Sequence, residues 1–223
     1  MGGQRKAVVA TTTICPTITT DNPDTYSRQV ELTLAYAHRI HIDVADGVFT
    51  SNRLIDIENV WWPAGVRADL HVMYQNPFDH LETLISLSPQ LIIVHAEADG
   101  DFLQFASACH HHGMEVGVAL LPETPVEAIQ PALGLVDHVL IFSGHLGHFG
   151  GHADMSLLGK VQKLKALKPQ LEIGWDGGVS DQNARALALG GVDVLNAGGY
   201  LHGAMAPKTA YLKLLAEVTS RRG

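Results

Sequence analysis

Short apolar segments alternate with segments of helical periodicity along the 223-residue chain, and this alternation restricts the possible folds most strongly. Residues 91–95 (LIIVH) are apolar almost throughout, which is typical of a parallel strand covered on both faces. Alternating strand and helix patterns indicate an α/β protein with a parallel sheet. Eight strands are predicted, at residues 7–14, 39–43, 67–73, 91–95, 115–120, 138–142, 171–175 and 192–196.

A count of eight strands favours a (β/α)8 TIM barrel over an open doubly wound sheet, which remains the alternative. The weakest helix pattern follows the second strand, around residues 55–62. No linker-like composition interrupts the chain, so one domain over residues 1–223 is expected. The other helices are predicted at residues 25–37, 77–87, 101–112, 125–133, 155–167, 181–189 and 206–219.

Charge and composition exclude several classes of partner. The formal net charge is −8, and no basic run exists beyond Arg221 and Arg222, which argues against nucleic-acid or membrane-surface binding. No run of about 18 apolar residues predicts a membrane span. Two cysteines without a CxxC pattern favour a reducing cytoplasm, and we interpret the start of the chain as a strand, not a signal peptide.

Two histidines and two aspartates fall at the ends of predicted strands. His41 and Asp43 are two residues apart, so their side chains point to the same face of the strand. His71 and Asp176 lie at the ends of two later strands. Active sites of (β/α)8 barrels lie at the carboxyl ends of strands, and mixed nitrogen and oxygen ligands suit a divalent metal. We therefore predict one metal site from these four residues; ordinary hydrogen-bonding roles are the alternative.

Short motifs follow one another in a fixed order over nearly the whole chain. They are CPTI at 15–18, HIDVADG at 41–47, DLHVM at 69–73, VHAE at 94–97, GVAL through PETP at 117–125, FGG at 149–151, DGGV at 176–179 and AGG at 197–199. Each motif alone is weak. Together, in this order, they resemble the ribulose-phosphate 3-epimerase family.

The resemblance implies a barrel that interconverts D-ribulose 5-phosphate and D-xylulose 5-phosphate by inverting carbon 3. It implies a divalent metal (zinc, iron or manganese) held by the four residues above, with Asp43 and Asp176 also serving as the acid–base pair. It implies a small sugar-phosphate substrate and, commonly for this class, a homo-oligomer. The residues expected to contact substrate or phosphate are Thr17, Met73, Gly150, Gly151, Gly177, Gly198 and Gly199.

The reaction is chemically consistent with these residues. The proton on carbon 3 is α to a ketone, so its removal gives an enediolate that a nearby positive charge must stabilise. One carboxylate removes the proton from one face, and a second, protonated carboxyl returns a proton to the other face. Two acids in different environments can hold these different protonation states at neutral pH.

Some positions depart from the family pattern. Ala45 and Phe142 stand where the family usually has methionine, and the loop 144–152 lacks the usual proline and ends in His152 instead of glutamine. These departures leave another ketose phosphate, such as D-allulose 6-phosphate, and a non-catalytic sugar-phosphate-binding barrel as alternatives. A decarboxylase-type barrel is disfavoured, because no predicted strand carries a lysine at its carboxyl end.

Further polar residues of the sequence are expected to lie outside the ligand set. Asp46 is expected to shape a turn, and Asp69 to be a buried partner on the face of His71. For His95 and Glu97, contacts behind the metal ligands and a purely structural role are equally open. Solvated positions are expected for His110, His111 and His112, and a solvated loop, a phosphate contact or a second metal site for His145, His148 and His152.

Overall fold

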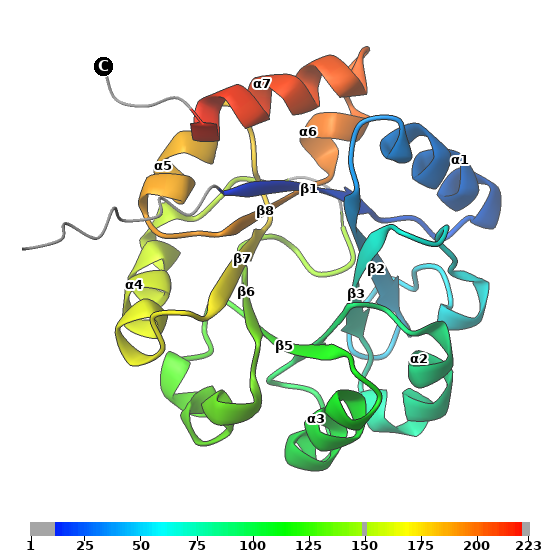
Figure 1. Cartoon of the computed structure of the whole chain (residues 1–223), viewed down its shortest axis with the longest axis vertical. Helices are drawn as coiled ribbons and strands as arrows, with labels where there is room; N and C mark the ends of the chain where they lie inside the picture. The colour runs from blue at the N-terminus through cyan, green and yellow to red at the C-terminus, as the bar shows by residue number, and fades with distance from the viewer. Residues whose placement is uncertain (1–11, 149–150, 220–223) are drawn as a thin grey trace, which may run out of the picture.

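Eight parallel strands close into a barrel in the computed structural model, which describes residues 12–148 and 151–219. Each strand pairs with the next along the chain, and β1 pairs with β8 to close the ring (Figure 1). The (β/α)8 barrel is thereby confirmed over the open sheet. The strands are β1 (Thr13–Ile18), β2 (Arg39–Ala45), β3 (Arg67–Met73), β4 (Leu91–His95), β5 (Glu115–Leu120), β6 (His138–Phe142), β7 (Glu172–Asp176) and β8 (Val194–Ala197).

Helices surround the barrel on its outside (Figure 1). Helix α1 begins where the Asn22 side chain accepts a hydrogen bond from the backbone N–H of Thr25, a typical N-cap. The α-helices are α1 (Pro23–Leu34), α2 (Leu81–Leu87), α3 (Phe102–His111), α4 (Leu158–Leu167), α5 (Ala184–Leu189), α6 (Gly199–His202) and α7 (Pro207–Thr219). The 3-10 helices are η1 (Ile57–Asn59), η2 (Pro77–His80), η3 (Val126–Leu135) and η4 (Met155–Leu157).

Three predicted elements differ from the structure. The segment after β2 forms only the short η1, in agreement with its poor helical pattern. The helix expected at 125–133 is the 3-10 helix η3, which contains Pro131; proline lacks the N–H that an α-helix interior requires. Strand β1 extends beyond the predicted end at residue 14, because residues 13–16 pair with β8 and residues 17–18 pair with β2. The earlier part of that prediction, residues 7–11, lies outside the described residues.

The barrel interior is layered along its axis. At the amino ends of the strands, Arg39 makes a two-pronged ion pair with Glu172 and a 2.6 Å bond to the buried Asp69. Beside these polar groups, Leu91, Ile93, Ala119 and Leu140 form a small apolar cluster. Side chains alternate along a strand, so Arg39, His41 and Asp43 all face inward, one above another. Strand β2 therefore directs Arg39 inward at its amino end, and His41 and Asp43 inward toward its carboxyl end.

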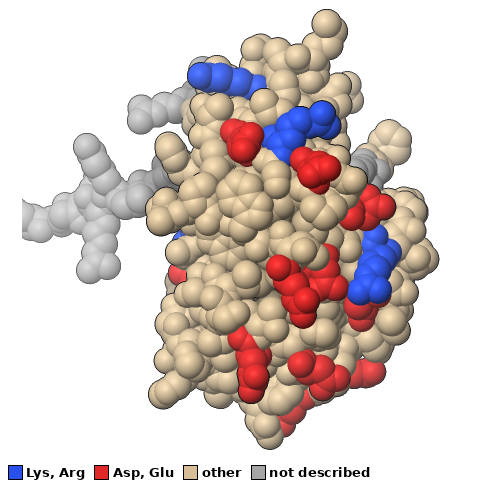
Figure 2. Space-filling view, turned by 90° about the vertical axis from the view of Figure 1, so that its right-hand side faces the viewer, with Lys and Arg blue, Asp and Glu red and all other residues tan. Residues whose placement is uncertain are grey.

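The surface shows no sign of a basic binding face in the available view. Acidic side chains predominate on the lower half of Figure 2, and the basic ones do not merge into a continuous patch. Within residues 12–148 and 151–219, no helix has both the length and the apolar character needed to cross a membrane.

Candidate metal centre and active site

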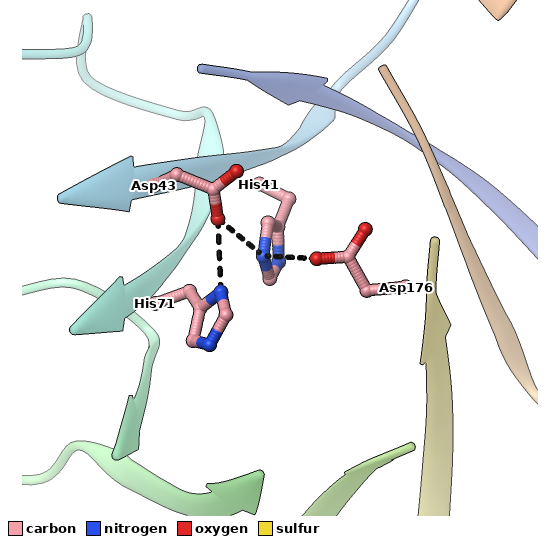
Figure 3. Close-up of side chains that lie close together, drawn as sticks. All are labelled: His41, Asp43, His71 and Asp176. Atoms are coloured by element: carbon pink, nitrogen blue, oxygen red, sulfur yellow. Dashed lines mark hydrogen bonds and ion pairs between the residues drawn. The ribbon is translucent and has the colours of Figure 1, made fainter. Parts of the chain in front are cut away.

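His41, Asp43, His71 and Asp176 converge at the carboxyl end of the barrel (Figure 3). Asp43 Oδ1 lies 2.9 Å from His71 Nδ1 and 3.3 Å from His41 Nε2. His41 Nε2 lies 3.9 Å from Asp176 Oδ2. One ligand atom from each residue lies within 4.8 Å of all the others. The four residues can therefore surround a single ion.

Strand register produces this convergence. Strand β2 pairs with β3 so that Asp43 is directly opposite His71, and His41 is opposite Asp69 one step lower. Asp176 is the last residue of β7, on another side of the barrel. Two consecutive strands and a third that is distant in sequence thus deliver their side chains to one point.

Two further side chains, which were not predicted from the sequence, contact these groups. The Thr19 hydroxyl donates a 2.5 Å hydrogen bond to Asp43 Oδ2, which leaves Oδ1 directed at the two histidines. The Asn196 side-chain amide lies 3.1 Å from His41 Nδ1. The nearer atom is the amide nitrogen, and the amide oxygen is buried without a partner; an amide rotated by 180° would let its oxygen accept from Nδ1–H and would leave Nε2 with its lone pair. Both residues lie beside the cluster only because β1 and β8 close the barrel.

The two carboxyl groups have opposite proton affinities. Burial raises the pKa of Asp43, but its contacts with His41 and His71 outweigh burial and hold the pKa well below its ordinary range. Burial, followed by the charge of Asp43, raises the pKa of Asp176 well above its ordinary range. Burial also lowers the pKa of His71 to about 4. The site therefore combines an ionised carboxylate, a carboxyl that tends to keep its proton, and a neutral imidazole.

The donor set fits a divalent metal. His41 Nε2 is buried and has no hydrogen-bond partner, although two carboxylates face it. A buried polar atom of this kind is costly unless something binds it. Two imidazole nitrogens and two carboxylate oxygens suit zinc, iron or manganese.

A cavity of about 640 Å³ lies over the cluster and includes Asp43 and Asp176 in its wall. Of the described residues that line it, none is a lysine or an arginine. An anion bound there must therefore rely on backbone N–H groups and on neutral or histidine side chains. The predicted substrate residues Thr17, Met73, Gly151, Gly177, Gly198 and Gly199 all line this cavity, whereas Gly150 lies outside the described residues.

Two glycines shape the cavity wall. Gly177 and Gly178 have φ angles of +110° and +69°, which non-glycine residues rarely adopt. A Cβ on Gly177 would collide with the backbone of residues 143–144, and one on Gly178 with the backbone of residues 152–153. The loops after β6 and β7 thus pack backbone against backbone beside the site.

The remaining polar residues take mostly supporting positions. The Asp46 carboxylate accepts hydrogen bonds from the N–H groups of Val48, Phe49 and Gln75 and so shapes the turn, as expected. His110 is not merely solvated, because it lies 2.8 Å from Asp137. His148 contacts Asn52 and, like His152, lines the cavity.

The two departures from the family pattern have different surroundings. Phe142 is buried and lines the cavity, with its ring 6.2 Å from that of His71. Ala45 instead packs with Leu54 and Met73, against Phe49 and Leu146. A side-chain change at 142 therefore alters the cavity wall directly, whereas a change at 45 acts through the packing behind it.

Comparison with known proteins identifies the family. The ribulose-phosphate 3 epimerase family model matches residues 13–202, most of the chain. The chain belongs to the ribulose-phosphate 3-epimerase family. Like its relatives, this family member is an isomerase-class enzyme, and the family supports epimerase activity on a ketose phosphate.

Curated relatives cover most of this epimerase-family chain. It is 33% identical over 183 residues to a ribulose-phosphate 3-epimerase of Helicobacter pylori, covering 78% of this chain and 83% of that protein. It is 31% identical over 175 residues to one of Schizosaccharomyces pombe, covering 76% of this chain and 77% of the relative.

More distant solved structures share only the fold with this epimerase-family chain. A Mycobacterium tuberculosis tryptophan synthase structure superposes with a TM-score of 0.72 at 16% identity, over 96% of this chain and 95% of the other. A 3-hexulose-6-phosphate synthase from Salmonella typhimurium gives a TM-score of 0.62 at 13% identity, over 92% and 98%. These similarities agree with the barrel architecture.

Proposed function

We propose that this protein is a metal-dependent epimerase that interconverts D-ribulose 5-phosphate and D-xylulose 5-phosphate. The observation that carries the proposal is the pair Asp43 and Asp176. The two carboxyls have opposite proton affinities and share a metal-type donor set beneath one cavity. A barrel that only binds a sugar phosphate has no need of two such carboxyls.

The acid–base roles follow from these protonation states. Asp43, ionised and held by Thr19, removes the proton from carbon 3 on one face of the sugar. Asp176, which tends to keep its proton, donates to carbon 3 from the other face; in the reverse direction the roles exchange. His41, Asp43, His71 and Asp176 would hold a divalent metal, which would supply positive charge beside the carbon that loses its proton.

Backbone N–H groups are the proposed phosphate ligands. Gly151, Gly177, Gly198 and Gly199 line the cavity, and glycine backbone allows close approach of a phosphate. Thr17 and Met73 line the same cavity and are proposed as substrate contacts. Binding by N–H groups is consistent with a cavity whose described lining has no lysine or arginine.

Proton exchange at carbon 3 tests the proposal. The purified protein, loaded with zinc, iron or manganese in parallel samples, is incubated with D-ribulose 5-phosphate in deuterated water and followed by NMR. We expect deuterium at carbon 3 together with D-xylulose 5-phosphate. Neither exchange nor product with any of the metals would refute this substrate; D-allulose 6-phosphate is then the next to test, and failure of both favours a non-catalytic barrel.

The variant Asp176→Asn separates the two acid–base roles. It keeps an oxygen at the site but removes the acid, so epimerisation should fall by about 100- to 10,000-fold. Asp43 should still exchange the carbon 3 proton of one epimer with solvent, but not that of the other. Asp137→Asn, at the amino end of β6, is the control and should remain fully active. Full activity of Asp176→Asn would exclude the proposed role.

A further inference from the structure

His95 and Glu97, at and just beyond the end of β4, lie directly behind the metal-type cluster. His95 Nε2 is 2.9 Å from His71 Nε2, the ring nitrogen that faces away from the cluster. His95 Nδ1 is 3.3 Å from a carboxylate oxygen of Glu97. Glu97 itself accepts hydrogen bonds from the Leu121 N–H and the Thr124 hydroxyl. A continuous series of contacts therefore runs from Asp43 through two imidazoles to a second carboxylate.

The surroundings of the His95 ring limit the hydrogen-bond partners that its two nitrogens can reach. Its side chain is fully buried. The ring of Phe49 packs 4.8 Å away, and that of Phe142 lies 6.1 Å away, edge to face. With apolar rings around it, the imidazole must satisfy its two nitrogens through His71 and Glu97.

Counting hydrogens gives this series a direction. Three contacts in this series each need one N–H hydrogen: Asp43–His71, His71–His95 and His95–Glu97. Two neutral imidazoles carry only two N–H hydrogens between them. If His71 Nε2–H donates to His95, then His95 Nδ1–H donates to Glu97, and His71 Nδ1 is left with a lone pair facing Asp43. That one unfilled contact is where a cation fits. The opposite direction would fill the Asp43 contact and leave a bare His95 nitrogen against the Glu97 carboxylate; only the first direction leaves the unfilled contact where the four ligand residues converge.

We propose that His95 and Glu97 are positioning residues that fix the tautomer and ring orientation of His71, so that Nδ1 is free to bind a divalent metal. The inference rests on the metal centre proposed above, but not on the identity of the sugar. Outer partners of metal-binding histidines commonly act in this way, and their loss lowers metal affinity by about 10- to 100-fold.

Two substitutions at residue 95 test this directly. His95→Leu retains bulk but removes both nitrogens, so zinc affinity, measured by competition with a chelator, should fall by about 10- to 100-fold. His95→Gln keeps an acceptor for His71 and a donor for Glu97, so its affinity should stay within a few-fold of wild type. Glu97→Gln should weaken zinc binding to an intermediate extent. Cobalt substitution adds a spectroscopic readout, because a misoriented His71 changes the visible absorption of the bound ion.

His138→Leu provides a matched control. His138 is also a buried strand histidine paired with a glutamate, Glu172 at 2.8 Å, but it lies at the opposite end of the barrel. The His138→Leu variant should be less stable than the wild type but should bind zinc with the same affinity. Wild-type affinity in His95→Leu would overturn the inference, as would equal loss in His95→Gln and His95→Leu. If the wild type itself binds no divalent metal, the proposed metal centre fails and the inference fails with it.

Discussion

Replacement of Thr19 by valine should impair catalysis without disturbing the barrel. The Thr19 hydroxyl donates a 2.5 Å hydrogen bond to Asp43 Oδ2, and both residues are 5% exposed. Valine has nearly the same shape as threonine but cannot donate. The substitution therefore removes one directed contact from the proposed base and leaves packing almost unchanged.

The size of the effect follows from the type of bond. A hydrogen bond to a charged group contributes about 1.5–3 kcal/mol. Because about 1.4 kcal/mol corresponds to a tenfold change in rate, loss of this bond should lower kcat/KM by roughly 10- to 150-fold. The same loss should raise the pKa of Asp43, since the hydroxyl stabilises the ionised form.

The assay is carbon 3 epimerisation at saturating metal, with the metal content of each variant measured in parallel. Thr19→Ser is the matched control, because it keeps the hydroxyl and should recover most of the activity. A Thr19→Val enzyme within about twofold of wild type would refute the argument that this hydroxyl positions Asp43. A loss in Thr19→Ser together with full activity in Thr19→Val would show that the methyl group, rather than the hydroxyl, is what matters.

Three further changes probe the ligands, the cavity wall and the opposite end of the barrel. His71→Ala should lower zinc affinity by more than the roughly 10- to 100-fold expected for outer partners; unchanged stoichiometry and affinity would remove His71 from the ligand set. Gly178→Ala should raise KM and destabilise the fold by about 1–2 kcal/mol or more, because it combines a positive φ with a backbone collision, whereas Gly159→Ala, with open space around it, should do neither. Burial raises the pKa of Glu172, but hydrogen bonds from Arg39 and His138 outweigh burial and hold the pKa below its ordinary value. Ionised Glu172 therefore stabilises the fold above about pH 4.3, and this stabilisation is lost as the pH falls further. Urea unfolding of Glu172→Gln should therefore differ from wild type most at neutral pH and least in acid; a pH-independent difference would contradict this.

Much of the site could be predicted from sequence, because side chains alternate between the two faces of a strand and barrel sites lie at the carboxyl ends of strands. His41 and Asp43 share a face because they are two residues apart, and His71 faces them because β2 and β3 are consecutive strands of a parallel barrel. The bounds of β3, β4, β5 and β6 agree with the predictions, because turn-forming residues lie beside these strands.

The contacts that orient the ligands could not be predicted in the same way. Thr19 follows β1 and Asn196 belongs to β8, and both approach the cluster only after the first and last strands pair. The His71–His95 contact needs two side chains on neighbouring strands at matching heights and rotamers, which a sequence pattern does not specify. Likewise, the first strand was predicted to end at residue 14, yet Pro16 lies within β1, opposite Ala197.

Both ends of the barrel contain buried carboxyl groups, but their partners differ. At the amino ends, the buried charge of Asp69 is compensated inside the protein by Arg39, which also binds Glu172. At the carboxyl ends, Asp43 and Asp176 face two histidines, and the buried His41 Nε2 is left without a hydrogen-bond partner. Buried charge is expensive, and among the described residues this end has no arginine or lysine paired with its carboxyl groups, so it gains most from an external cation. The end with complete ion pairs therefore stabilises the fold, and the end with an incomplete set is the one suited to bind a metal and to do chemistry.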